Sequence, residues 1–254
     1  MLFDTHAHYN DSRFDSDRDA LIRSLRYENV GLVVNPGCDL ESSLAAVEYA
    51  RTYPHFYAAV GVHPSDIDKV DDAAFEKIAD LARTEKKVVA IGEIGLDYYW
   101  HKDNKEEQKA FFRRQMALAR ELDLPVIVHD REAHGDCLDI VDEFPQVKGV
   151  FHCFSGSAEY AKELVRRGWY ISFTGSATFK NAHKLREAVI VVPDDRIMIE
   201  TDSPYMAPEP VRGRRNSSLY LTHICRRLAE ERCISYEEFE RQTTENGKRF
   251  FGIE

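Results

Sequence analysis

Eight short apolar runs, each followed by a polar turn and a stretch with helical periodicity, predict an α/β protein, a (β/α)8 TIM barrel with an extra C-terminal helix. The chain has 254 residues, a length at which such barrels commonly form one unit. Runs such as VVAI and PVIV are apolar without interruption, as in parallel strands that are buried on both faces. We therefore expect a single domain over residues 1–254.

The predicted strands end about 19 to 33 residues apart, which leaves room for one strand and one helix in each unit. In chain order the runs are LFDTHAH, GLVVNPG, FYAAVGVHP, VVAIGEIGLD, LPVIVHD, KGVFHCFSG, WYISFTG and IMIETDSP. A doubly wound open sheet has the same alternation of strands and helices. Eight units without a GxGxxG motif after the first strand favour the closed barrel over this alternative.

The segments between the runs carry apolar residues at three- and four-residue spacing, which predicts helices. Examples are ADLARTEKK, EEQKAFFRRQMALAREL, AEYAKELVRRG and SLYLTHICRRLAEE. Asn104, with Glu107 three residues later, predicts a capping box at the start of the longest of these helices. The last segment, SYEEFERQTTENGKRFFG, predicts the extra helix that closes the barrel.

The composition limits the possible partners and compartments. The formal net charge of −10 argues against broad adhesion to duplex DNA, which depends on many Lys and Arg contacts, but a site that holds phosphates on metal ions needs no basic surface. Five cysteines without a CxxC pair indicate reduced thiols. The N-terminus MLFDTHAHYN does not resemble a signal peptide, and no apolar run approaches the roughly 20 residues of a membrane span. We expect a cytoplasmic protein without membrane contact, and no protein partner is indicated.

Polar residues gather at the ends of six of the eight predicted strands. They are His6, His8, His63, Glu93, Asp97, His129, Asp130, His152, Glu200 and Asp202. In a barrel these ends converge on the C-terminal rim, where barrel enzymes place their chemistry. The sequence therefore predicts a polar site assembled from distant segments.

Imidazoles and carboxylates from five strands suit divalent cations such as Zn²⁺, Mn²⁺ or Mg²⁺. His6 and His8 lie two residues apart, so on a strand both side chains point the same way. A structural zinc site usually contains cysteines, and no cysteine pair is available here. The number of candidate ligands is too large for one tetrahedral ion and indicates a pair of metals.

Several motifs in succession resemble those of the TatD family of metal-dependent deoxyribonucleases, a branch of the amidohydrolase-like barrels. They are DTHAH, GVHP, EIGLDYYW, PVIVHDRE, FHCFSG and ETDSPYMAP, followed by RGRRN. The similarity extends in order over about 215 residues. One departure is that Ser217 and Ser218 follow RGRRN, where the family usually has an acidic residue and a proline.

The resemblance implies a set of metal ligands at His6, His8, Glu93, His129, His152 and Asp202. It also implies that His6, His8 and Asp202 bind one ion, that His129 and His152 bind the other, and that Glu93 lies between them. We expect the catalytic roles to fall on Glu93, Asp202 and His63, with His63 contacting phosphate or orienting a ligand. Glu200 is expected to support a ligand rather than to bind metal.

Residues near the predicted rim are candidates for binding a substrate. They are Arg212, Arg214, Arg215, Tyr98 and Tyr99. The arginines could bond flanking phosphates, and the tyrosines, with Trp100 beside them, are placed where bases of a single strand could stack. At least one of the three aromatic residues is expected to be buried. Asp97 and Asp130 are expected to make local hydrogen bonds in turns.

These observations predict a two-metal phosphodiester hydrolase that uses Mg, Mn or Zn. From the resemblance we expect a 3'-to-5' exodeoxyribonuclease acting on single-stranded DNA ends. One alternative is a TatD-like hydrolase that removes D-amino acids from tRNA, with the same metals and a different pocket. A second alternative is a noncatalytic binding protein on the same barrel, against which the retention of all six candidate ligands argues.

Overall fold

The computed structural model describes all residues from 1 to 254 and contains eight strands, which follow one another in the sheet in the order of the chain. The strands are β1 (Leu2–Asp4), β2 (Val30–Pro36), β3 (Phe56–Val60), β4 (Val88–Asp97), β5 (Val126–Arg131), β6 (Gly149–Phe151), β7 (Tyr170–Phe173) and β8 (Ile197–Ile199). Every strand pair with a described register is parallel. This strand order is that of a (β/α)8 barrel, as predicted.

Helices connect successive strands. The α-helices are α1 (Arg18–Ser24), α2 (Leu40–Thr52), α3 (Asp72–Thr84), α4 (Lys105–Leu122), α5 (His134–Asp142), α6 (Ala158–Arg166), α7 (His183–Val191), α8 (Leu221–Glu231) and α9 (Tyr236–Phe251). Short 3₁₀ segments are η1 (Ser12–Phe14), η2 (Leu25–Tyr27), η3 (Ile67–Lys69), η4 (Gly175–Thr178) and η5 (Ser218–Tyr220).

The contacts within the chain divide it into two compact units, which are described separately. The first unit comprises Met1–Asn35 and Cys153–Glu254, and the second comprises Pro36–His152. The single domain over residues 1–254 remains a prediction.

In the first unit, the last strand lies beside the first. The backbone N–H of Thr5 donates to the carbonyl of Ile199 over 3.4 Å, and Ala7 forms a parallel bridge with Ser203. β1 also pairs with β2, and β8 pairs with β7. The order of strands thus continues from β8 to β1, a connection that an open doubly wound sheet does not make.

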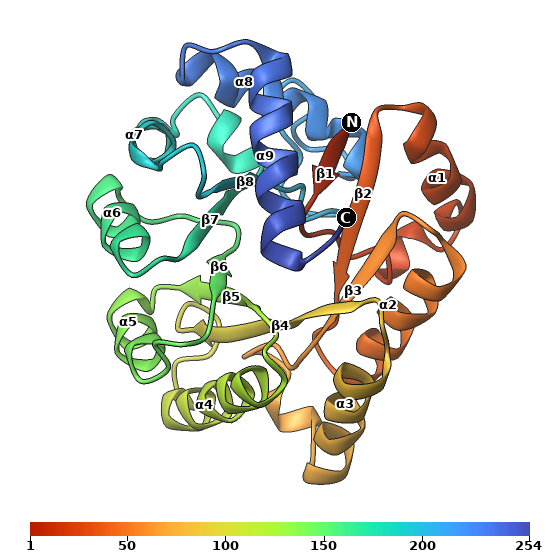
Figure 1. Cartoon of the computed structure of the whole chain (residues 1–254), viewed down its shortest axis with the longest axis vertical. Coiled ribbons are helices and arrows are strands. Elements are labelled where there is room, and N and C mark those ends of the chain that lie inside the picture. The colour runs from red at the N-terminus through yellow and green to blue at the C-terminus, as the bar shows by residue number, and fades with distance from the viewer. The chain divides into compact units, whose positions relative to one another are not determined.

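The extra C-terminal helix is present as α9 and contacts β1 and β8 (Figure 1). The hydroxyl of Ser235 caps this helix by accepting the N–H of Glu238 over 3.1 Å. On its buried face the Phe251 ring packs 5.8 Å from the ring of Phe3 on β1. The helix therefore buries apolar side chains of the first strand.

In the second unit, all ten residues of β4 are buried between β3 and β5. Figure 1 shows α3, α4 and α5 on the outer side of these strands. Asp39 and Ser42 form a capping box at the start of α2, and Asp71 caps α3 through the N–H of Ala74. These caps fix where the helices begin, and the buried strands supply the core.

The predicted capping box at Asn104 is wrong. Asn104 does precede α4, but its side chain makes no cap hydrogen bond. Instead its Oδ1 accepts from the side-chain amide of Gln108 over 2.8 Å. That amide also donates to the carbonyls of Asp97 and His101, so Gln108 ties the start of α4 to the loop before it.

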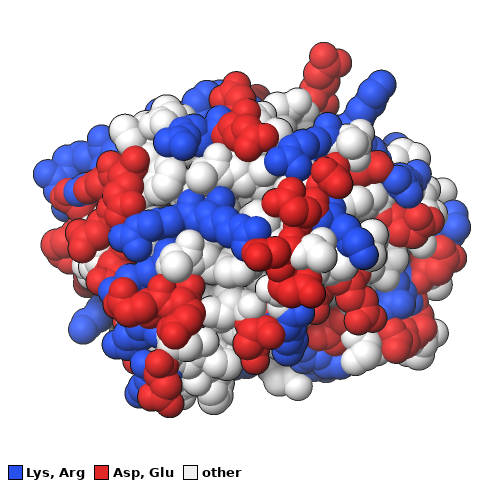
Figure 2. All heavy atoms as spheres, turned by 90° about the horizontal axis from the view of Figure 1, so that it is seen from below, with Lys and Arg blue, Asp and Glu red and all other residues white.

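No helix combines the length and apolar character that crossing a bilayer requires. On the face drawn in Figure 2, Lys and Arg side chains are mixed with Asp and Glu side chains.

Candidate metal centre

In the first unit, two histidines and one aspartate bring three possible metal donors together. His6 and His8 follow β1, and Asp202 follows β8. The Nε2 atoms of the two imidazoles are 3.0 Å apart, and Asp202 Oδ1 lies 3.9 Å from the first and 3.5 Å from the second. All three side chains are buried. Two imidazole nitrogens with a carboxylate oxygen suit a divalent cation such as Zn²⁺ or Mn²⁺.

The backbone after β1 explains why both imidazoles point the same way. β1 is shorter than predicted and ends before His6, but the bridge at Ala7 keeps the segment extended. The N–H of Asp202 donates to the His6 carbonyl over 2.9 Å, and the N–H of His8 donates to the Ser203 carbonyl over 2.7 Å. Residues on either side of Ala7 therefore project from the same face.

A buried hydrogen-bond network around Asp4 supports this cluster. Its Oδ1 accepts from the backbone N–H of Thr201 over 2.8 Å, and its Oδ2 accepts from the hydroxyls of Thr201 and Ser218, each over 2.6 Å. Ser218 in turn accepts from the Tyr9 hydroxyl over 2.9 Å. Burial raises the pKa of Asp4 to about 7, against the opposing effect of these hydrogen bonds. Ser218, one of the two residues that depart from the family pattern, is thus part of the support.

Glu200 also bonds to the backbone. Its Oε1 accepts the N–H of Cys153 over 2.6 Å, and its Oε2 lies 3.4 Å from the hydroxyl of Thr5. These contacts agree with a supporting carboxylate rather than a metal ligand.

In the second unit, three imidazoles converge on one carboxylate oxygen. Glu93 Oε1 lies 2.7 Å from His152 Nε2, 2.8 Å from His129 Nδ1 and 3.5 Å from His63 Nε2. Glu93 lies on β4 and His129 on β5, while His63 follows β3 and His152 follows β6. Donor atoms of His63, Glu93 and His129 all lie within 4.8 Å of one another, close enough to share one ion.

Asp97, the last residue of β4, holds the far side of the His129 ring. Its Oδ2 lies 3.2 Å from His129 Nε2. A histidine that binds metal through one ring nitrogen commonly donates the other N–H to a carboxylate. Asp97 was expected to make local hydrogen bonds, and it does, but its bond to His129 spans two strands. In the register of these strands, Gly95 on β4 lies opposite His129 on β5. Asp97, two residues further along β4, is therefore close enough for its side chain to reach the His129 ring.

Burial and charge act differently on the imidazoles of this cluster. Burial lowers the pKa of His63 to about 3, and the proximity of His129 lowers it further, so His63 is neutral. For His129, burial alone would lower the pKa, but the hydrogen bonds with Asp97 and Glu93 outweigh it and raise the pKa. Asp97 has its own pKa lowered to about 2, because hydrogen bonds from His129 and two backbone amides outweigh the effect of burial.

The tautomer of His63 follows from a local contact. The backbone N–H of Ser65 donates to His63 Nδ1 over 3.1 Å. Because Nδ1 accepts, the proton of the neutral ring sits on Nε2, the nitrogen that faces Glu93. The His63 ring is thus bonded to the local turn through Nδ1, and its Nε2 edge faces Glu93.

The aromatic residues after β4 differ in exposure. Tyr98 is buried and its hydroxyl donates to Asp136, so it does not offer a free face for stacking. Tyr99 is 43% exposed and Trp100 is 65% exposed. One of the three aromatic residues is therefore buried, as expected. Tyr98 was a candidate for binding substrate, but the exposed rings are those of Tyr99 and Trp100.

The arginines after β8 are unequal as candidates for binding phosphate. Arg215 forms an ion pair with Asp17 over 2.6 Å and donates to the backbone. The Arg212 guanidinium lies 4.1 Å from the centre of the Phe179 ring, and Arg214 is exposed. Arg212 and Arg214 are thus more available than Arg215, which holds two segments of the first unit together.

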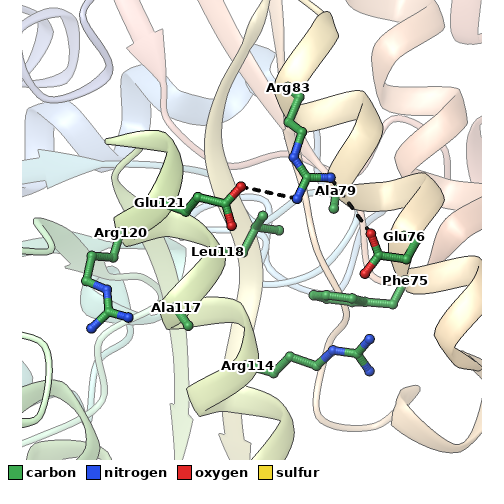
Figure 3. Close-up of a pocket in the computed structure, with 9 residues that line it drawn as sticks. All are labelled: Phe75, Glu76, Ala79, Arg83, Arg114, Ala117, Leu118, Arg120 and Glu121. Atoms are coloured by element: carbon green, nitrogen blue, oxygen red, sulfur yellow. Dashed lines mark hydrogen bonds and ion pairs between the residues drawn. The ribbon is translucent and has the colours of Figure 1, made fainter.

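A separate groove of about 420 Å³ lies between α3 and α4 (Figure 3). Its charged groups are largely paired with each other, since Arg83 lies 3.3 Å from Glu121 and 3.8 Å from Glu76. Arg114 pairs with Asp72 and covers the Phe75 ring. None of the predicted site residues lines this groove.

Comparison with known proteins agrees with this geometry. The family described as TatD related DNase matches residues 3–252. The Bacillus subtilis protein named "Uncharacterized metal-dependent hydrolase YabD" is 44% identical over the whole of both chains. A Cronobacter sakazakii protein named "3'-5' ssDNA/RNA exonuclease TatD" is 36% identical over 98% of this chain and 97% of its own.

A solved structure shares the fold over the full length. The crystal structure of YJJV, a TatD homologue from Escherichia coli, has a TM-score of 0.94 and 30% identity, covering 100% of this chain and 98% of its own. The (β/α)8 fold expected from the sequence is thereby confirmed. On these similarities the chain belongs to the TatD family of DNase-related, metal-dependent hydrolases.

Proposed function

We propose that this hydrolase cleaves phosphodiester bonds of single-stranded DNA, removing nucleotides in the 3'-to-5' direction with two divalent metal ions. The observation that carries the proposal is the convergence of three imidazoles on Glu93 Oε1 within 3.5 Å. A folded core does not require so many buried polar groups around one oxygen, whereas a metal centre does. The names of the exonuclease relatives supply the class of substrate.

The donor sets fit divalent ions. We propose that His6, His8 and Asp202 bind one ion, and that His129, His152 and Glu93 contribute to the other. Imidazole nitrogen and carboxylate oxygen suit Mn²⁺ or Zn²⁺, and water would complete the shell of Mg²⁺. The bond between His129 and Asp97 is the kind of outer contact that orients a ligating histidine.

Bound divalent ions would stabilise charge on the phosphoryl oxygens and lower the pKa of an attacking water. The protein groups then have separate tasks. Neutral His63 is proposed to donate its Nε2–H to a phosphate oxygen, because Ser65 fixes its tautomer. Asp202, whose side chain is 13% exposed, is proposed to accept a proton from the water. Glu93 keeps the imidazoles around it in place.

Each unit offers exposed residues that are proposed to contact the substrate. Arg212 and Arg214 offer guanidinium groups to flanking phosphates, and Tyr99 offers an aromatic face. Arg215 contributes through the loop that it anchors to Asp17. All five cysteines are free thiols, which fits the proposed cytoplasmic location.

The test is hydrolysis of a 5'-labelled oligonucleotide with Mg²⁺, Mn²⁺ or Zn²⁺, and with EDTA. We expect a ladder that shortens from the 3' end, blocked by EDTA and by a phosphorothioate linkage at that end. Glu93→Gln and His129→Ala should abolish cleavage. Glu143→Gln and His134→Asn change the same residue types at partly exposed positions of the second unit and should keep it.

Parallel assays separate the alternatives. A D-aminoacyl-tRNA that is deacylated faster than the oligonucleotide is cleaved would reassign the substrate and keep the metal centre. Unchanged cleavage by both Glu93→Gln and His129→Ala would refute the proposed centre. If the protein binds nucleic acid but hydrolyses none of the substrates with any of the three metals, the noncatalytic binding protein would be favoured.

A further inference from the structure

The loop that follows β4 presents two large aromatic rings to solvent. Trp100 is 65% exposed and Tyr99 is 43% exposed. Their ring centroids are 4.7 Å apart and their planes are perpendicular, so the two rings form a corner. The other tryptophan of the chain, Trp169, is buried. Exposing two large aromatic rings to water is unfavourable, and a role in binding would explain why they are exposed.

A guanidinium group lies against both rings. The Arg131 carbon Cζ lies 4.3 Å from the centre of the Tyr99 ring and 5.5 Å from the centre of the Trp100 ring. Arg131 is the last residue of β5, two positions after His129, so its side chain leaves the strand on the same face. Its guanidinium forms no ion pair with a carboxylate. The positive charge beside the rings therefore remains available to an anion.

The carboxylate of Asp97 bonds to the backbone of both aromatic residues and also contacts His129, a candidate metal ligand. Asp97 Oδ1 accepts the backbone N–H of Tyr99 over 2.9 Å and that of Trp100 over 2.8 Å. Its Oδ2 faces His129 Nε2. Gln108 fixes Asp97 further, accepting its N–H over 2.8 Å. The two rings are thus held at a defined position next to the His129 cluster.

Resting on the proposed function, we propose that Trp100, Tyr99 and Arg131 form a subsite that binds one unpaired base of single-stranded DNA and its adjacent phosphate. An aromatic face stacks on any base, and an unpaired guanidinium bonds phosphate oxygens. Duplex DNA buries its base faces in its own stack, so the subsite selects single strands. The stacking is independent of sequence because every base has a π face.

The test is binding in EDTA, where no hydrolysis occurs, read from tryptophan fluorescence. A short oligo(dT) should quench the emission of Trp100, and an abasic deoxyribose-phosphate chain of equal length should quench it far less. Trp100→Ala should weaken oligo(dT) binding, measured by anisotropy, roughly 5- to 150-fold, the range that base stacking on one ring implies. Trp100→Phe should lose less, because a smaller ring remains.

Matched controls limit the interpretation. Tyr27→Ala removes another exposed ring, 89% exposed on the first unit, and should leave affinity unchanged. Arg131→Gln should weaken binding of oligo(dT) and of the abasic chain alike, since it removes a phosphate contact. Trp100→Ala should raise KM for the oligonucleotide and leave kcat in Mn²⁺ unchanged at saturation.

Equal affinities of the native protein and Trp100→Ala for oligo(dT) would overturn the subsite. That result is separable from failure of the proposed hydrolase. Cleavage by the native protein with no effect of Trp100→Ala removes the subsite alone. Trp100-dependent binding without cleavage in any metal supports the subsite and removes the hydrolytic assignment.

Discussion

Asp97 and His129 lie on neighbouring strands, with Oδ2 of the carboxylate 3.2 Å from Nε2 of the imidazole. The other ring nitrogen, Nδ1, faces Glu93 Oε1 at 2.8 Å. The imidazole is therefore fixed between two carboxylates, one of which belongs to the proposed metal centre. These two contacts orient the ring, and such support reduces the cost of organising a metal site.

Asp97→Asn should weaken metal binding. The amide group cannot replace the negative charge that faces His129, and loss of such an outer contact typically costs 10- to 100-fold in metal affinity or activity. We expect a drop of this size in Mn²⁺ affinity, measured by titration calorimetry. The control is Asp130→Asn. Asp130 lies on β5 beside His129, but its carboxylate pairs with His134. Unaltered Mn²⁺ affinity in Asp97→Asn would exclude the orienting role.

The asparagine keeps an oxygen that accepts the amides of Tyr99 and Trp100. Binding of oligo(dT) in EDTA should therefore stay close to that of the native protein. A loss of DNA affinity equal to that of Trp100→Ala would mean that the charge of Asp97, and not its oxygen alone, holds the aromatic corner.

The strand order could be predicted because buried parallel strands are read as continuous apolar runs. The run VVAIGEIGLD corresponds residue for residue to β4. The end of β1 could not be predicted in the same way, because LFDTHAH continues as extended chain to His8. In the structure the ladder stops at Asp4, and the bridge of Ala7 with Ser203 holds the rest. That bridge joins segments almost 200 residues apart, which no local pattern reveals.

The residue types of the candidate site could be predicted from the sequence. The contacts that hold these residues in place were harder to predict. Strand ends with His, Asp and Glu were recognisable from the sequence and from family motifs. The burial of Tyr98 involves Asp136, which lies in α5 and accepts the Tyr98 hydroxyl, a contact 38 residues apart in the chain that no local pattern reveals. The position of Arg131 has a signal in the sequence, because residues two apart on a strand share a face, as His129 and Arg131 do.

Gly247→Ala should destabilise the protein although alanine favours helices. Gly247 lies inside α9, and an added Cβ would come within 2.7 Å of the Phe3 ring and 3.2 Å of Thr5. Overpacking of this kind costs about 1–3 kcal/mol, more than the roughly 1 kcal/mol that helix propensity returns. Urea denaturation of the variant should show this loss.

The matched variant is Gly135→Ala in α5. No atom lies within 4 Å of the added Cβ there. We expect no loss of stability and a gain of up to about 1 kcal/mol, because alanine restricts the unfolded chain. A stable Gly247→Ala protein would show that α9 can move away from β1 at little cost.

Ser218→Ala should destabilise the first unit through the Asp4 network. The hydroxyl donates to Asp4 and accepts from Tyr9, and all three side chains are buried. Removing it leaves the Tyr9 hydroxyl without this acceptor, which costs about 1–3 kcal/mol. Adding Tyr9→Phe to the Ser218→Ala protein should recover part of the lost stability, because the Tyr9 hydroxyl that lacks an acceptor is then removed. Additive losses in the double variant would contradict the coupling of the two hydroxyls.

The pair of Asp11 with Arg13 should contribute a measurable dependence of stability on acid. The Arg13 side chain donates to both carboxylate oxygens of Asp11, over 2.9 and 2.8 Å. This bonding lowers the pKa of Asp11 to about 2, below its ordinary value of 3.8. A carboxyl whose pKa is lower in the folded state stabilises the protein above the unfolded value, and the contribution disappears as pH falls from about 4 to 2.

Asp11→Asn should therefore be less stable than the native protein at pH 6. Because the Arg13 side chain is 46% exposed, we expect only about 1 kcal/mol. The difference, measured by urea denaturation at steps from pH 6 to pH 3, should narrow as the native carboxylate begins to take up a proton. Asp103→Asn changes an exposed aspartate outside any ion pair. Its free energy of unfolding should change with pH in the same way as that of the native protein. A constant difference between Asp11→Asn and the native protein at every pH would show that the hydrogen bonds matter and the charge of Asp11 does not.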